Sequence, residues 1–158
     1  MRFDRRGYTL IELLVVMAVL GLLASMAMPL AEVTVQRERE RELRRALWEI
    51  RDAIDAYKRA RDAGAIAGPV VGSRLPPDLL ALTRAVPDAR GDHRGEVLRF
   101  LRTVPRDPFA DPALGAERSW GLRSYLSEAA DPKPGADVYD VHSLSDRLGL
   151  NGVPLKQW

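Results

Sequence analysis

The stretch RRGYTLIELLVV, residues 5–16, joins a short basic leader that ends in Gly7 to an apolar run that holds one carboxylate, Glu12. The carboxylate lies five residues after the glycine, and the following 19 residues, Leu13 to Ala31, carry no charge. Because a helix rises about 1.5 Å per residue, this uncharged run reaches about 28 Å, close to the hydrocarbon thickness of a bilayer. The sequence therefore predicts a helix that can cross a membrane.

The flanking charges bear on the orientation of this helix. The leader contains three arginines, but arginines also follow the span, so the positive-inside rule alone does not decide. A long domain after the span can be translocated regardless of its charge. We therefore expect the short arginine-rich end to stay in the cytoplasm.

The predicted helix continues beyond the apolar run with a different character. Residues 36–42 read QRERERE, which suits a solvated helix with opposite charges three residues apart. An apolar stripe at helical spacing follows, made of Leu43, Ala46, Leu47, Ile50, Ala53, Ile54 and Tyr57. Gly64 and the glycines after it should end the helix, so one helix from about Tyr8 to Asp62, roughly 80 Å long, is predicted. Pro29 should kink or locally unwind it.

The region from residue 63 to 158 is rich in turns and too small to bury much surface alone. Short helices are predicted at Pro77–Ala85 and Glu96–Thr103, and strands at Trp120–Ser127 and Val138–Ser143. We expect the strands to form a small antiparallel sheet that covers the apolar stripe of the long helix. The predicted fold class is α+β.

Composition argues against several classes of function. Removing residues 1–7 takes away three arginines and one aspartate and leaves 21 basic and 21 acidic side chains, whereas phosphate-backbone binders cluster an excess of Lys and Arg. No nucleic-acid partner is therefore expected. The chain has no cysteine, and no catalytic triad, phosphate loop or metalloprotease pattern occurs. An enzymatic role has no residues to support it.

The N-terminal pattern resembles the class III signal of type IV prepilins and type II secretion pseudopilins. The resemblance implies that a prepilin peptidase cuts between Gly7 and Tyr8 and methylates the new amino terminus. The family usually has Phe or Met at the first mature position, so Tyr8 is a mild departure. Three later segments, residues 104–109, 120–125 and 138–143, look like the C-terminal region of the major, G-type pseudopilins, which also lack a disulfide.

This resemblance implies a pilin-like chain in four parts: a leader at residues 1–7, a transmembrane half-helix at 8–31, an amphipathic half-helix at 32–62 and a small periplasmic α+β region at 63–158. The expected function is a structural subunit of a type II secretion pseudopilus, anchored by a single pass in the inner membrane. Its expected partners are membrane lipid, the peptidase, an assembly platform and other pilin-like subunits in a helical filament. The alternative is a major or minor pilin of a type IV pilus, used for adhesion, motility or DNA uptake.

Two residues in the helix are expected to act in assembly. Glu12 must be paired or neutralised in apolar surroundings, and the amino terminus of a neighbouring subunit's Tyr8 is its natural partner in a filament. Pro29 shapes the helix. No cofactor is expected apart from calcium, which G-type pseudopilins often hold in the loop that corresponds to Ser143, Ser145 and Asp146. Here the later acidic ligands are missing, so we expect weak calcium binding or none, with Trp158 packing against the loop instead.

Other interpretations of the N-terminus stay open at this stage. The apolar run could be an ordinary secretory signal cleaved after residues 25–27, read SMA, but this leaves the Gly7 context unexplained. It could also anchor an unrelated periplasmic domain. A carboxylate within a membrane helix is costly and usually functional, so Glu12 favours the pilin-like interpretation.

Overall fold

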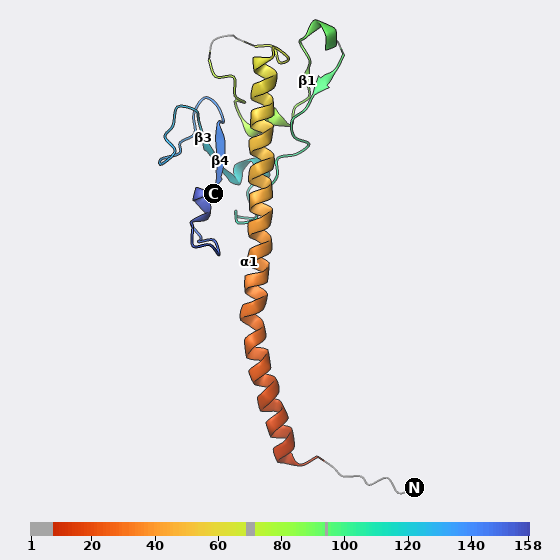
Figure 1. Ribbon diagram of the computed structural model, residues 1–158, viewed down its shortest axis with the longest axis vertical. Helices are drawn as coiled ribbons and strands as arrows, with labels where there is room; N and C mark the ends of the chain where they lie inside the picture. Colours follow the sequence, from red (N-terminus) through yellow and green to blue (C-terminus); the bar gives the residue numbers. More distant parts are fainter. Residues whose placement is uncertain (1–7, 69–71, 94) are drawn as a thin grey trace, which may run out of the picture. The chain divides into compact units, whose positions relative to one another are not determined.

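The computed structural model describes residues 8–68, 72–93 and 95–158, except for the side chains of residues 25–31. The chain divides into two compact units, residues 1–38 and residues 39–158. A single helix, α1, runs from Leu10 to Asp62 and contributes to both units (Figure 1). The predicted long helix is therefore confirmed within two residues at its start and at the same residue at its end.

The end of α1 has a clear local cause. The Ala65 N–H donates to the carbonyl of Ala60 over 2.9 Å, and the Gly64 N–H donates to the carbonyl of Arg61 over 3.2 Å. These two bonds form a Schellman motif, in which the residue after the cap takes a left-handed conformation. Gly64 has a φ of 73°, which glycine adopts without the steric cost of a Cβ atom. The sequence signal at Gly64 was therefore read correctly.

The second unit is built on the apolar stripe of α1. Its six aliphatic members are at most 5% exposed, and Tyr57 is partly buried against them. The stripe packs with buried residues of the C-terminal region, among them Leu82, Trp120, Val141 and Leu155. The predicted burial of the stripe beneath the C-terminal region is confirmed.

Among the described residues of this unit, the β structure consists of two small antiparallel sheets and an isolated bridge between Leu148 and Pro154. Strand β3 (Trp120–Arg123) pairs with β4 (Asp140–Ser143), in a register that places Trp120 opposite Ser143 and Arg123 opposite Asp140. The two strands lie side by side near the C-terminal end of the chain (Figure 1). Strand β1 (Val86–Pro87) pairs with β2 (Val97–Leu98) in a second, shorter sheet. The predicted strands occur at the predicted places but are shorter.

The helix expected at Glu96–Thr103 is wrong. This segment begins as β2, because the Asp88 N–H donates to the carbonyl of Glu96 over 3.0 Å and closes a hairpin. The amides of Phe100 and Leu101 then both donate to the carbonyl of Leu82. Long-range pairing therefore takes the backbone groups that a helix would have used.

The other helical elements in the described ranges are 3-10 turns. The helix expected at Pro77–Ala85 is reduced to η1 (Leu79–Leu82), which Asp78 caps by accepting a hydrogen bond from the Ala81 N–H over 2.7 Å. The other turns are η2 (Gly91–His93), η3 (Ala116–Arg118) and η4 (Leu155–Gln157). Within the part of the chain that the structure describes, no helix is both long enough and apolar enough to cross a membrane.

A buried carboxylate ties the C-terminal segments together. The Asp107 side chain is fully buried and accepts hydrogen bonds from the Ser143 hydroxyl over 2.6 Å and from the Phe109 N–H over 2.7 Å. Nearby, the Trp120 indole N–H donates to the carbonyl of Pro105 over 2.8 Å. The loop around residues 104–109 is thereby fixed to β3 and β4, and these are the three segments that carry the C-terminal resemblance.

Candidate processing and assembly segment

The start of α1 is closed by a reciprocal pair of hydrogen bonds. The Thr9 hydroxyl accepts from the Glu12 N–H over 3.2 Å, and the Glu12 carboxylate accepts from the Thr9 N–H over 3.3 Å. This is a capping box, with threonine at the N-cap and glutamate three residues later. The pattern Thr-x-x-Glu is visible in the sequence, but reading Glu12 as an assembly residue alone missed it.

The candidate processing site lies immediately before this cap. Gly7 is outside the described residues, so the structure does not place the bond expected to be cut. Tyr8 precedes the helix and is 79% exposed. A helix that starts at Leu10 therefore leaves the first expected mature residue outside regular structure. Position 29 lies within α1, but the side chain of Pro29 is not among the described ones. The kink that Pro29 is expected to cause in the helix stays a prediction.

The first turns of α1 expose an unusual amount of apolar surface. Every large apolar side chain that is described between Leu10 and Leu23 is half or more exposed. Soluble monomers rarely expose contiguous apolar patches of more than a few hundred Å², and a larger patch marks a surface that has a partner. Lipid or other apolar helices would satisfy it. The expected span, Leu13 to Ala31, ends in residues 25–31, whose side chains lie outside the described residues.

The three calcium candidates are engaged in other contacts. The Ser143 hydroxyl donates to Asp107, and Ser143 is fully buried. The Ser145 hydroxyl accepts a hydrogen bond from the Arg147 N–H over 3.4 Å. Asp146 forms an ion pair with Lys156 over 2.7 Å, and this pair lowers the pKa of the Asp146 carboxyl. The structure therefore joins each candidate to a different partner, and weak calcium binding stays a prediction.

The C-terminal loop is instead attached to α1 by other side chains. Trp158 packs against the hydrophobic core, and the Arg44 guanidinium stacks 4.4 Å from the centre of its ring. The sequence did not indicate the role of Glu40, which is 4% exposed and accepts a hydrogen bond from the Leu150 N–H over 2.7 Å. A charged residue in the alternating run of residues 36–42 therefore anchors a loop more than a hundred residues away.

The β1–β2 hairpin brings together three side chains that could hold a metal ion: Asp88, His93 and Glu96. His93 Nδ1 lies 3.0 Å from Glu96, but Arg90 binds both carboxylate oxygens of Asp88. This contact lowers the pKa of Asp88 from 3.8 to about 2, chiefly through the hydrogen bonds that the Arg90 side chain donates. A cation would have to displace the guanidinium, so we assign no metal to the hairpin.

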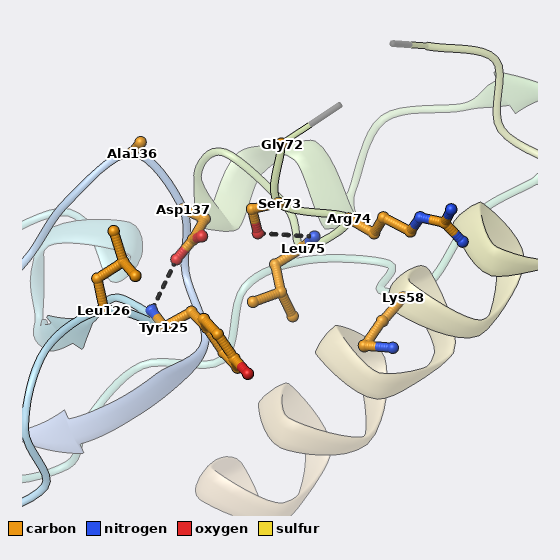
Figure 2. Close-up of a pocket in the computed structure, with 9 residues that line it drawn as sticks. All are labelled: Lys58, Gly72, Ser73, Arg74, Leu75, Tyr125, Leu126, Ala136 and Asp137. Atoms are coloured by element: carbon orange, nitrogen blue, oxygen red, sulfur yellow. Dashed lines mark hydrogen bonds between the residues drawn. The ribbon is translucent and has the colours of Figure 1, made fainter. Parts of the chain in front are cut away.

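A cleft of about 490 Å³ opens beside the C-terminal end of α1. Figure 2 shows Leu75 and Tyr125 on its walls, with the amide of Tyr125 donating to Asp137 over 2.9 Å. Its two cations, Lys58 and Arg74, both pair with Asp62 and lower the pKa of that carboxyl, Lys58 having the larger effect. The cleft therefore offers apolar surface beside two cations that share one carboxylate.

Comparison with known proteins bears on the N-terminal segment. Residues 2–28 match the family described as the prokaryotic N-terminal methylation motif. No curated protein and no solved structure matches the chain at a significant level. Residues 2–28 therefore carry the prepilin leader motif found in type IV pilin-like proteins. The long helix with a small antiparallel sheet is consistent with a pilin-like fold.

Proposed function

We propose that this chain is a structural subunit of a type II secretion pseudopilus and not an enzyme. The methylation motif at residues 2–28 carries the proposal, because it couples a peptidase site to an apolar helix. The exposed apolar surface from Leu10 to Leu23 supports it, since a filament core of bundled helices would cover that surface. The precursor waits in the inner membrane, with its leader in the cytoplasm and its second unit in the periplasm.

Processing and assembly are linked through Glu12 in this proposal. The peptidase cuts between Gly7 and Tyr8 and methylates the new amine, which exposes a positive charge four residues before Glu12. A carboxylate has about four lone-pair sites, so the hydrogen bond from Thr9 leaves room for a second partner. In the filament that partner is the amino terminus of a neighbouring subunit. Heterologous contacts of this kind do not close, and identical subunits then form a fibre on the assembly platform.

The pseudopilus is preferred to a type IV pilus because of the second unit. The three segments that resemble G-type pseudopilins contact one another: Ser143 donates to Asp107, and Trp120, which lies opposite Ser143, donates to the carbonyl of Pro105. The absence of cysteine agrees with this preference. A pilin role in adhesion, motility or DNA uptake is the alternative, and neighbouring genes for a secretion ATPase and channel or for a retraction ATPase would separate the two.

The test is the recovery of the chain in sheared filaments. In cells with an active prepilin peptidase and assembly platform, the processed chain should appear in the sheared fraction. A matched strain without the peptidase should keep all of it in the membrane. Filaments that form equally well without the peptidase, or processed chain that never leaves the membrane, would contradict the proposal. Loss of secreted substrates on deletion of the gene would favour the pseudopilus, and loss of surface pili would favour the pilus.

A further inference from the structure

A second cleft, of about 260 Å³, lies between α1, β3, β4 and the C-terminal η4. Three cations line it, Arg51 from α1, Arg123 from β3 and Lys156 from η4, against one side-chain carboxylate, Asp140 from β4. The side chains that line the cleft therefore carry an excess of positive charge, although the side chains of residues 8–158 balance.

Two of the three cations have a carboxylate partner among the described residues, and the third does not. Arg51 donates from Nε to Asp140 over 2.7 Å and from Nη2 to the main-chain oxygens of Val141 and Trp158, so the side chains of Arg51 and Asp140 neutralise each other. Lys156 pairs with Asp146, whose side chain is 84% exposed, and water and salt weaken such a pair. No carboxylate within the described ranges lies at ion-pair distance from Arg123.

Two buried hydrogen-bond donors at this cleft have no acceptor. Among the described residues, the buried side-chain nitrogens and oxygens without a partner are Arg123 Nε and Trp158 Nε1, and both residues line the same cleft. Buried donors in folded proteins are nearly always paired, with protein or with ordered water. The indole of Trp120, by contrast, donates to Pro105. The complement of two donors and surplus cations is a group that accepts hydrogen bonds and carries negative charge.

The backbone and neighbouring rings hold the cleft in shape. Gly121 on β3 lies beneath the ring of His142, and a Cβ atom there would come within 2.2 Å of the imidazole. The Arg123 guanidinium lies 5.2 Å from the ring centre of Tyr139 and reaches the carbonyl of Ser127 only at 3.5 Å. Arg123 is thus positioned by stacking, while its hydrogen-bonding capacity is largely unused.

We propose that this cleft binds a phosphate group. The donors that stay available lie on Arg123 of β3 and on Lys156 and Trp158 at the C-terminal end, and donors on more than one side suit the three oxygens of a phosphate better than the planar pair of a carboxylate. Free phosphate and the headgroup of an anionic phospholipid both supply this chemistry. The proposal is independent of the leader and of filament assembly.

The test uses the full chain, labelled with ¹⁵N and solubilised in a nonionic detergent. Inorganic phosphate and glycerophosphoglycerol, the deacylated headgroup of phosphatidylglycerol, are titrated separately at constant ionic strength, with acetate as the carboxylate probe. The Trp158 indole N–H and the Arg123 Nε–H should shift and saturate, while the hydrogen-bonded Trp120 indole stays in place. Tighter binding of inorganic phosphate identifies a free phosphate as the ligand, and equal or tighter binding of glycerophosphoglycerol identifies the headgroup.

Matched variants assign the effect to the cleft. Arg123→Gln should weaken phosphate binding at least tenfold, whereas Arg118→Gln, at a side chain that is 80% exposed and away from the cleft, should leave it unchanged. The fold of each variant is checked through the Trp120 indole signal. Shifts that never saturate, equal losses in both variants, or acetate binding as tight as phosphate would each overturn the proposal.

Discussion

Thr9 and Glu12 together cap the start of α1, because each side chain accepts a hydrogen bond from the backbone amide of the other residue. In the proposed mechanism Glu12 has two separable roles. Its shape and acceptor oxygen complete the cap, which glutamine can also do, whereas its charge serves to attract an amino terminus. The two roles can be tested apart by substitution.

Glu12→Gln should keep α1 capped but lose the attraction for the neighbouring Tyr8 amine. We expect Glu12→Ala and Glu12→Gln to insert and be cleaved normally and to lose filament assembly, because both lack the charge that matters in a low dielectric. Thr9→Ala removes the cap, at a cost of about 1 kcal/mol, and should reduce assembly only in part. The measurement is the yield of sheared filaments from each variant, compared at equal levels of processed protein. Wild-type yield from Glu12→Gln would reduce Glu12 to a capping residue.

Acid should loosen the β1–β2 hairpin through Asp88. Because Arg90 lowers the pKa of Asp88 from 3.8 to about 2, the ionised carboxylate stabilises the folded state above pH 3.8. That contribution is lost as the pH falls from about 4 to about 2. Hydrogen exchange of the Asp88 amide, which donates to Glu96, should accelerate in this window beyond its intrinsic pH dependence. Asp88→Asn should abolish the extra acceleration, and Asp92→Asn, at a side chain 78% exposed, should preserve it.

The buried Asp107 should contribute far more to the free energy of unfolding than Asp111, an exposed aspartate that forms the same kind of turn. Asp107→Ala leaves the Ser143 hydroxyl and the Phe109 amide without their acceptor and should cost at least about 2 kcal/mol. Asp111 accepts from the Ala113 amide in the same way but at an exposed site, so Asp111→Ala should cost less than about 1 kcal/mol. Urea unfolding of the detergent-solubilised chain, followed by tryptophan fluorescence, compares the two. Equal costs would show that the network adds nothing beyond the turn.

Calcium should bind weakly or not at all. Ser143, Ser145 and Asp146 each have another partner, and calcium needs six to eight oxygen ligands. Lys156→Gln releases Asp146 but supplies no further carboxylate, so it should not create a site. Calorimetric titration of both proteins is the measurement, and tight stoichiometric uptake by the unaltered chain would refute the expectation.

The sequence was most informative where local rules decide the structure. Helical periodicity and Gly64 were enough to predict α1 and its buried stripe, because spacing and a left-handed cap are local properties. The segment after Glu96 was misread because its hydrogen bonds go to residues 82 and 88, and pairing at that distance leaves no local signal.

The residues of the candidate site also differ in how far the sequence alone could predict them. Gly7, Tyr8 and Glu12 follow from a linear motif, and the capping pattern of Thr9 was also readable there. The anchoring role of Glu40 and the convergence of Arg123 and Trp158 on one cleft depend on how distant segments pack. Residue type and spacing do not determine such contacts.

The central claim, that this chain is a processed pilin-like subunit, is tested most directly by the intact mass of the protein extracted from membranes of its native host. The account predicts a mass that lacks residues 1–7 and gains one methyl group, with tandem fragmentation placing that methyl on the amine of Tyr8. A mature chain that starts at Met28 would instead indicate an ordinary secretory signal, and an unprocessed chain that starts at Met1 would contradict the account as a whole.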